Sequence, residues 1–315
     1  MNNKVTVIGA AIIDIMAGAI DKDLFERGSV PADRMEMTCG GDGLNEAVVL
    51  SNLGLDCELV TLLGKDETAE TILKYLNENR VSVSKVTRSD DIITGINIVL
   101  VDKDGERYFI TDPNGSLRKL SRGSILPHVE TMGDIVSFAS IFVSPMLSVS
   151  DMEEVFKAVK EKPGRILVAD TTKAKNGETI TDLEPVLKYI DFIMPNEIEA
   201  AVLTGEQDPI KNARIFMDHG AKCVVIKCGK RGCVYADDKG IHSIPAYPVK
   251  AVDTTGAGDG FVAGFIYGLA NGMPIPDCCR YGCATASVTV EHMGTKCIKG
   301  SFDEVTKRYG VLRTF

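Results

Sequence analysis

The chain has 315 residues, of which 44% are hydrophobic and 25% are charged. This composition is that of a folded globular protein, and it excludes a disordered, collagen-like or membrane-bundle chain. The 35 basic and 44 acidic side chains give a net charge of −9, which disfavours nucleic acid as a partner because its phosphates are also negative.

The N-terminal region and the cysteines indicate the compartment. No apolar run approaches the roughly 18 residues that a membrane-spanning helix needs, so we expect no membrane partner. Asp14 interrupts the apolar stretch 5–20, which argues against a signal peptide. An odd number of cysteines, nine, indicates reduced thiols. The sequence therefore predicts a cytoplasmic protein.

Short apolar runs alternate with segments of helical periodicity along the whole chain. This order predicts a central, mostly parallel sheet with helices on both faces, in a single α/β domain over residues 1–315. The expected strands are 5–9, 57–63, 135–142, 166–170, 192–194 and 223–227. The expected helices are 45–53, 67–79, 151–160, 183–190, 210–219, 258–271 and 275–290.

Two segments interrupt this alternation. Residues 92–101 and 106–111 are typical of a β-hairpin, with Asp104-Gly105 as its turn. Residues 17–38 form an irregular stretch between the first strand and a Gly-Gly pair. We interpret the two segments as one small β-sheet lid, built from about 15–38 and 92–111.

The strongest chemical signal is the segment 253–260, with the sequence DTTGAGDG. Small residues before a helix leave backbone N–H groups accessible, and the helix N-terminus adds partial positive charge, so the segment suits a phosphate oxygen or an oxyanion. Asp259 lies in the first helical turn, where a carboxylate is either a helix-capping charge or a base aimed beside the anion. The segment is not a Walker A loop, because no Gly-Lys-Ser/Thr follows.

Residues 253–264 resemble the second signature of the ribokinase-like (PfkB) family of carbohydrate kinases, and residues 39–47, CGGDGLNEA, resemble the first. The resemblance implies a ribokinase-like fold and an ATP-dependent carbohydrate kinase. It identifies Asp259 with the catalytic base that deprotonates the acceptor hydroxyl. It also identifies the anion hole with Gly256, Ala257 and Gly258.

The same resemblance assigns the nucleotide and cation sites. Asn196 and Glu199 match the family's Asn-x-x-Glu element, which organises Mg²⁺ and phosphates largely through water; from composition alone they also fit a capping turn. The implied ATP-binding residues are Asn196, Lys227, Gly229, Gly232, Gly258, Cys283 and Ala284. The implied K⁺ site uses oxygens near Asp253, Thr255, Thr289, His292 and Gly294.

On the acceptor side, the family's sugar-binding positions match Asp14, which we expect to end the first strand, together with Gly40, Gly41 and Asn45, beside Asp259. We expect a small ribose- or fructose-like sugar with a primary hydroxyl. The alternatives are a nucleoside and a sugar acid, since the Gly-Gly-Asp form resembles that of some 2-keto-3-deoxygluconate kinases; Arg107 is the candidate cation for such an acid. Relatives dimerise through the lid, so a homodimer is expected.

Overall fold

The computed structural model describes residues 4–21, 23–103, 107–292 and 302–314. Within these residues, nine strands form a large sheet in the order β13-β12-β11-β10-β9-β8-β1-β4-β5. All neighbouring pairs are parallel except β11–β12 and β12–β13, which are antiparallel. The strands of the large sheet are β1 (Lys4–Ile8), β4 (Asp56–Gly64), β5 (Val86–Ser89), β8 (Ile135–Ile141), β9 (Ile166–Thr171), β10 (Phe192–Ile193), β11 (Val224–Lys227), β12 (Cys233–Asp237) and β13 (Gly240–Ile244).

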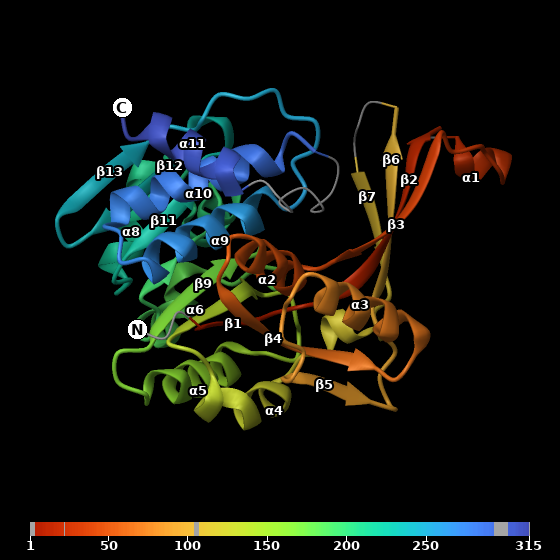
Figure 1. The fold of residues 1–315 in the computed structure, drawn as a ribbon, viewed down its shortest axis with the longest axis horizontal. Coiled ribbons are helices and arrows are strands. Elements are labelled where there is room, and N and C mark those ends of the chain that lie inside the picture. Colours follow the sequence, from red (N-terminus) through yellow and green to blue (C-terminus); the bar gives the residue numbers. More distant parts are fainter. Residues whose placement is uncertain (1–3, 22, 104–106, 293–301, 315) are drawn as a thin grey trace.

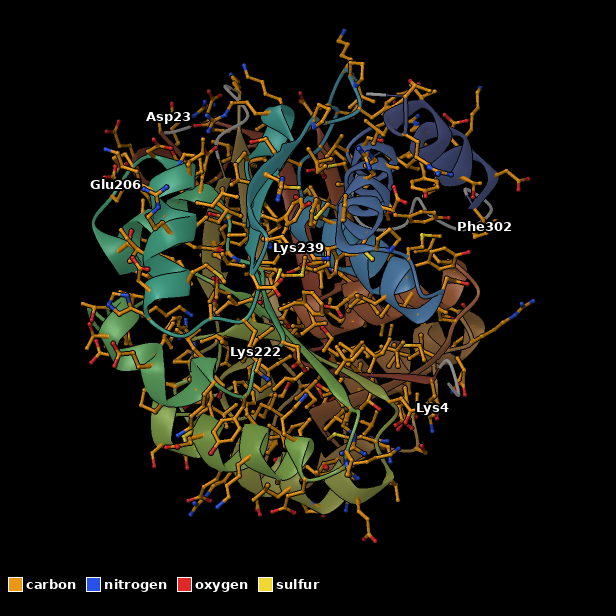
Figure 2. All side chains as sticks on the ribbon, turned by 90° about the vertical axis from the view of Figure 1, so that its left-hand side faces the viewer. Lys4, Asp23, Glu206, Lys222, Lys239 and Phe302 are labelled. Carbon is orange, nitrogen blue, oxygen red and sulfur yellow. The ribbon has the colours of Figure 1, made fainter. Side chains whose placement is uncertain are left out.

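Helices cover both faces of this sheet (Figure 1). One apolar core joins the sheet to α2 (Asp42–Asn52), α3 (Glu67–Glu78), α9 (Ala257–Ala270), α10 (Ile275–Thr289) and α11 (Phe302–Leu312). The other joins it to α4 (Arg122–Ile125), α5 (Val149–Lys160), α6 (Ile180–Leu187), α7 (Glu197–Thr204) and α8 (Pro209–Asp218). Figure 2 shows carbon-rich side chains filling the space between the layers, with charged residues such as Glu206 at the periphery.

The central strands are apolar on both faces because helices pack on both. In β1, Val5 and Val7 belong to one core and Ile8 to the other. In β4 the neighbours Leu59 and Val60 divide in the same way, and neither is exposed. The continuous hydrophobic runs of the sequence are therefore explained by burial from two sides.

Glycines allow α9 and α10 to pack closely. A Cβ at Gly260 would lie 2.6 Å from Thr289 Oγ1, and one at Gly264 would lie 2.4 Å from Thr285 Oγ1. Such contacts are too short for any other residue without displacement of α10. This packing fixes the position of the α9 N-terminus, which carries the Gly-rich motif.

A second, four-stranded sheet stands beside the large one, in the order β3-β2-β6-β7 (Figure 1). Its strands are β2 (Ile12–Ile20), β3 (Arg34–Gly40), β6 (Ile96–Asp102) and β7 (Arg107–Thr111), and α1 (Leu24–Arg27) lies between β2 and β3. The β6–β7 pair is antiparallel, as expected for a hairpin, whereas β2 and β6 are parallel. The expected turn Asp104-Gly105 lies outside the described residues.

The register of the small sheet separates an apolar row from a polar row. Ile15 lies opposite Met37 and Ile98, and Ile98 opposite Ile110. One residue along, Asp14 lies opposite Thr38 and Asn97, and Asn97 opposite Thr111. Because successive side chains of a strand point to opposite faces, the two rows lie on opposite faces of the small sheet.

The sequence predicted the fold class correctly, and several element boundaries differ. Asp14 does not end the first strand: β1 stops at Ile8, and Asp14 lies within β2 of the small sheet. The strands β5, β12 and β13 and the helix α11 were not predicted. In the described part of the chain, no helix combines the length and the apolar character needed to cross a membrane.

Candidate active site

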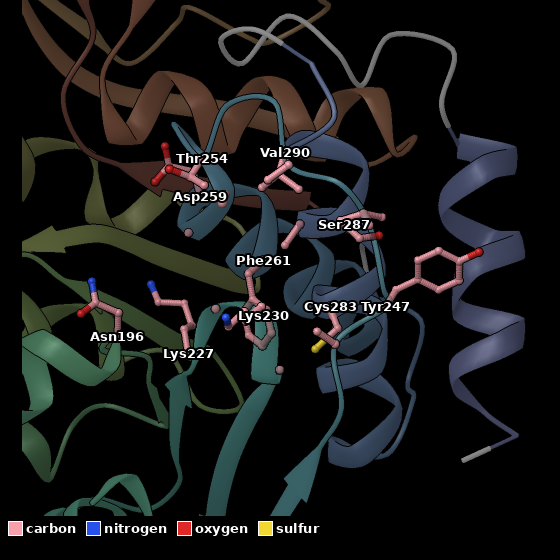
Figure 3. Close-up of a pocket in the computed structure, with 18 of the residues that line it drawn as sticks. Asn196, Lys227, Lys230, Tyr247, Thr254, Asp259, Phe261, Cys283, Ser287 and Val290 are labelled. Atoms are coloured by element: carbon pink, nitrogen blue, oxygen red, sulfur yellow. The ribbon is translucent and has the colours of Figure 1, made fainter. Parts of the chain in front are cut away.

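A cavity of about 900 Å³ opens at the carboxyl ends of the parallel strands. It extends over the first turn of α9, and its walls include Asp170 from β9, Asn196 after β10 and Lys227 from β11. In Figure 3, Asn196 and Lys227 lie at one end of the cavity and Cys283 and Tyr247 at the other. Open α/β sheets bind ligands at this edge.

Asp259 lies in the first turn of α9 and lines this cavity. The helix begins after Gly256, whose φ of 71° is left-handed, and no side chain caps it. The Ala257 N–H makes a 3.2 Å turn bond to the Thr254 carbonyl. Burial raises the pKa of Asp259 to about 6, although a hydrogen bond from Asn45 opposes this shift. A carboxylate with this pKa is mostly ionised at neutral pH and accepts a proton more readily than an exposed aspartate.

A hydrogen bond from Asn45 links Asp259 to the helix α2 near the N-terminus. Its Nδ2 donates to Asp259 Oδ2 at 2.8 Å, and the side chain comes from α2, which follows the Gly40-Gly41 turn. The Asn45 Oδ1 atom is buried and has no hydrogen-bond partner among the described residues. The amide therefore orients the carboxylate and leaves one acceptor oxygen for a hydroxyl group.

Close contacts and backbone conformation require glycine at positions 40 and 41. A Cβ at Gly40 would lie 2.1 Å from Asp14 Oδ2, and Gly41 has a φ of 97°. Burial raises the pKa of Asp14, while a hydrogen bond with Asn97 lowers it. The sequence analysis missed Asn97, because an asparagine in an alternating strand carries no motif; its Oδ1 is buried and unpartnered within the described residues.

The side chain of Asp42 stabilises the start of α2 through backbone hydrogen bonds. Its Oδ1 accepts from the backbone N–H groups of Ala10 and Gly43, each at 2.7 Å. A Cβ at Gly9 would lie 2.7 Å from Gly43 Cα and 2.9 Å from Ala139 Cβ. The end of β1, the start of α2 and β8 thus meet with no space for larger residues.

Asn196 and Glu199 form the capping box of α7. Asn196 Oδ1 accepts from the N–H groups of Ile198 and Glu199 at 2.9 Å, and Glu199 Oε2 accepts from the Asn196 N–H at 2.9 Å. Thr171 Oγ1 also donates to Glu199 Oε2 at 2.9 Å. Both residues line the cavity, so the capping and ligand-facing interpretations apply to the same pair.

Lys227 and Asp170 form a buried ion pair at the floor of the cavity. Their side chains are 11% and 6% exposed. Burial raises the pKa of Asp170 to about 7 against the opposing effect of Lys227. The sequence analysis missed Asp170; the available signal was a carboxylate at the carboxyl end of a buried strand.

Of the remaining residues expected to bind ATP, all but Ala284 line the cavity. A Cβ at Gly232 would lie 2.0 Å from the Ile244 carbonyl oxygen, and Gly229 and Gly232 both have positive φ. Gly229, Gly232 and Cys283 line the cavity. Ala284 is fully buried and does not line it; Ala286 and Ser287, further along α10, and Val290, just after the helix, do so instead.

The residues expected to bind Mg²⁺ and K⁺ differ in how well their oxygen atoms suit these ions. No cluster of three metal-ligating side chains occurs in the described part of the chain. Glu199 and Asp170 nevertheless supply the oxygen donors that suit a hydrated Mg²⁺ carried by a nucleotide. For K⁺, Thr255 Oγ1 is buried without a partner in the described ranges, beside Asp253 Oδ1, which accepts from the Thr255 N–H. Thr289 Oγ1 donates to the Thr285 carbonyl, His292 is exposed, and Gly294 lies outside the described residues.

Comparison with known proteins identifies the family. The model of the pfkB family of carbohydrate kinases matches residues 2–299. The chain belongs to the pfkB family. Ribokinase of Staphylococcus aureus is 25% identical over 98% of this chain and 100% of that protein. A 2-dehydro-3-deoxygluconokinase of Haemophilus influenzae is 24% identical over 87% of this chain and 93% of that protein.

Solved structures agree with the sequence comparison. The structure of Arabidopsis thaliana ribokinase complexed with ribose and ATP superposes with a TM-score of 0.82, at 25% identity, over 98% of this chain and 99% of that one. The predicted family and the ribokinase-like fold are confirmed. As a pfkB kinase, the chain is an ATP-dependent sugar kinase.

Proposed function

We propose that this pfkB kinase transfers the γ-phosphate of ATP to a primary hydroxyl of a small neutral sugar of the ribose or fructose type. The observation that carries the proposal is the 2.8 Å bond from Asn45 to Asp259. This bond holds a partly buried carboxylate of raised pKa at the wall of the cavity, next to the helix that follows Gly40-Gly41.

The acceptor groups match the chemistry of a sugar. Asp14, Asn45 and Asn97 offer a carboxylate and two amides, which are the groups that hydrogen-bond vicinal hydroxyls. The unpartnered Oδ1 atoms of Asn45 and Asn97 are acceptors that sugar hydroxyls would satisfy. Gly40 and Gly41 allow the ring to approach the backbone.

In the proposed reaction, Asp259 accepts the proton of the sugar hydroxyl as its oxygen attacks the γ-phosphorus, and Asn45 keeps the carboxylate oriented. The N–H groups at the start of α9, over residues 256–258, stabilise the negative charge on the transferring oxygens. Bound Mg²⁺ would neutralise phosphate charge, with Glu199 holding it through water. Asp253 and Thr255 would hold K⁺ beside the same loop.

We further propose that the small sheet is the lid of this site and an interface between two copies of the chain. The polar row with Asp14 and Asn97 would face the sugar, and closure would exclude water as a competing acceptor. The opposite row carries exposed apolar side chains, including Met37 (61%) and Ile110 (52%). Exposed apolar patches of this kind mark association surfaces.

One observation favours a sugar acid as the second candidate. Arg118 lowers the pKa of Lys175 in addition to the larger effect of burial, so two cations act on each other close to Asp42. Such a pair would suit a carboxylate on the acceptor, as in the Haemophilus relative. The side chain of Arg107, the cation expected from the sequence, lies outside what the structure describes.

The test is an ADP-release assay with the purified protein over a panel of pentoses, hexoses, 2-keto-3-deoxy sugar acids and nucleosides, each with K⁺ or Na⁺. We expect the highest kcat/KM with a neutral pentose or ketohexose. A higher kcat/KM with a sugar acid that falls in Lys175→Ala would support the second candidate. Absence of turnover with every sugar would refute both.

A further inference from the structure

The side chain of Lys227 reaches the anion site itself. It extends from the carboxyl end of β11, and its Nζ atom lies 3.4 Å from the position that a Cβ on Gly258 would occupy. Gly258 is in the first turn of α9, one residue before Asp259. The ammonium group therefore lies beside the first turn of α9, and Lys227 and Asp259 both line the cavity (Figure 3).

The surroundings keep this lysine charged. Burial lowers the pKa of Lys227, but the carboxylates of Asp170, Glu199 and Asp259 outweigh burial and raise it. Among the described residues that line the cavity, Lys230 is the other cation, and it is exposed. Lys227, whose side chain is only 11% exposed, is thus the more shielded of these two cations, and it lies among three carboxylates.

A buried ion pair is weak evidence for stability, because desolvation offsets most of the attraction between the charges. Phosphoryl transfer, in contrast, depends on cations placed at the transferring oxygens. The ammonium group of Lys227, on a flexible side chain beside the N-terminus of α9, meets that requirement. When no phosphate is bound, Asp170 is its partner instead.

We propose that Lys227 is a catalytic residue that exchanges its ion pair with Asp170 for a hydrogen bond to the γ-phosphate of ATP. The inference rests on the proposed kinase function and adds one reacting group to it. During transfer, the bond from the sugar oxygen to the γ-phosphorus forms and the bond from that phosphorus to the ADP oxygen breaks. The hydroxyl proton passes to Asp259, and Lys227 keeps its protons throughout. After transfer, ADP lacks the γ-phosphate, and the ammonium group returns to Asp170.

The competing explanation is that Lys227 only neutralises Asp170. The two explanations differ in what happens when Asp170 loses its charge. If neutralisation is the role, Asp170→Asn should rescue Lys227→Met. If the ammonium group contacts the γ-phosphate, the double variant should remain defective.

The experiment measures the Kd values of ATP and ADP by titration calorimetry, with Mg²⁺ and without sugar, for wild type, Lys227→Met, Asp170→Asn and the double variant. Lys222→Met is the matched control, because Lys222 precedes the same strand at its opposite end and pairs with Asp191 at the surface (Figure 2). We expect Lys227→Met to weaken ATP by about 10- to 100-fold, the scale of one hydrogen bond to a charged group, and ADP by less than about 3-fold.

Turnover gives the second readout. We expect kcat of Lys227→Met to fall by about 10²- to 10³-fold, with Lys222→Met unchanged. Equal losses of ATP and ADP affinity, or rescue by Asp170→Asn, would overturn the proposal. If Lys227→Met alone does not fold, the double variant, in which neither partner of the pair is charged, replaces it: loss of the preference for ATP over ADP supports the proposal, and a wild-type preference overturns it. If wild type binds neither nucleotide, the proposed kinase function fails instead.

Discussion

Replacing Asp259 by asparagine should abolish most activity and at the same time stabilise the protein. The substituted amide keeps one oxygen to accept the bond from Asn45, so the local geometry is preserved. Loss of the general base should lower kcat by at least about 10²-fold.

The stability gain follows from the pKa. Burial raises the pKa of Asp259 to about 6 from an ordinary value of 3.8, so the folded protein binds this proton more tightly than the unfolded chain does. The ionised carboxylate therefore costs the folded state up to about 3 kcal/mol above pH 6, and the cost disappears as the pH falls below about 4. The gain in free energy of unfolding in the variant should thus rise from about 1.5 kcal/mol at pH 5 to about 3 kcal/mol at pH 8.

Urea unfolding of both proteins at pH 5 and pH 8, with an ADP-release assay on the same samples, measures both effects. Near-normal turnover in the variant would remove Asp259 from its proposed role. A variant that is less stable than wild type at pH 8 would contradict the inference that the ionised carboxylate of Asp259 destabilises the folded protein.

Three further predictions concern the same site. The kcat/KM of wild type should fall about tenfold between pH 7 and pH 5, since a base with a pKa of about 6 is progressively protonated over this range; a flat profile measured by stopped assays would count against Asp259 as the base. Asp14→Ala should raise the Kd of the sugar by about tenfold or more with little change for ATP, which calorimetry separates; equal effects on both ligands would argue against a sugar-binding role. Gly232→Ala should destabilise the protein by more than the roughly 1–2 kcal/mol expected for Gly54→Ala in thermal melts, because both glycines have φ above +90° but only Gly232 would clash, with the Ile244 carbonyl.

The sequence predicted those features that depend on local composition. The alternation of apolar runs and helical segments was enough for the parallel sheet, because two-sided burial makes central strands continuously hydrophobic. The glycines before Asp259 predicted an anion site, and the structure places this segment at the start of α9, in the wall of the cavity. The position of one short segment was therefore accessible from its own residues, whereas its role in anion binding stays a prediction.

Features that depend on how distant segments meet were not accessible. The side of α10 that faces the cavity is set by contacts such as Gly264 with Thr285, so the sequence could not tell that Ser287 rather than Ala284 lines the wall. Asp170 was missed because its significance comes from Lys227, 57 residues later. Asp14 was placed at the wrong strand because the chain changes sheets within three residues, between Ile8 and Ile12.

The bond between Asn45 and Asp259 joins positions 214 residues apart. During translation, at about 5–20 residues per second, the N-terminal half emerges well before the helix that carries the proposed proton acceptor. A nascent chain that already holds its first strands and α2 consequently has no working centre until the last fifth of the polypeptide has been made and docked. Premature termination anywhere before α9 should therefore leave an inert fragment rather than a weakened enzyme.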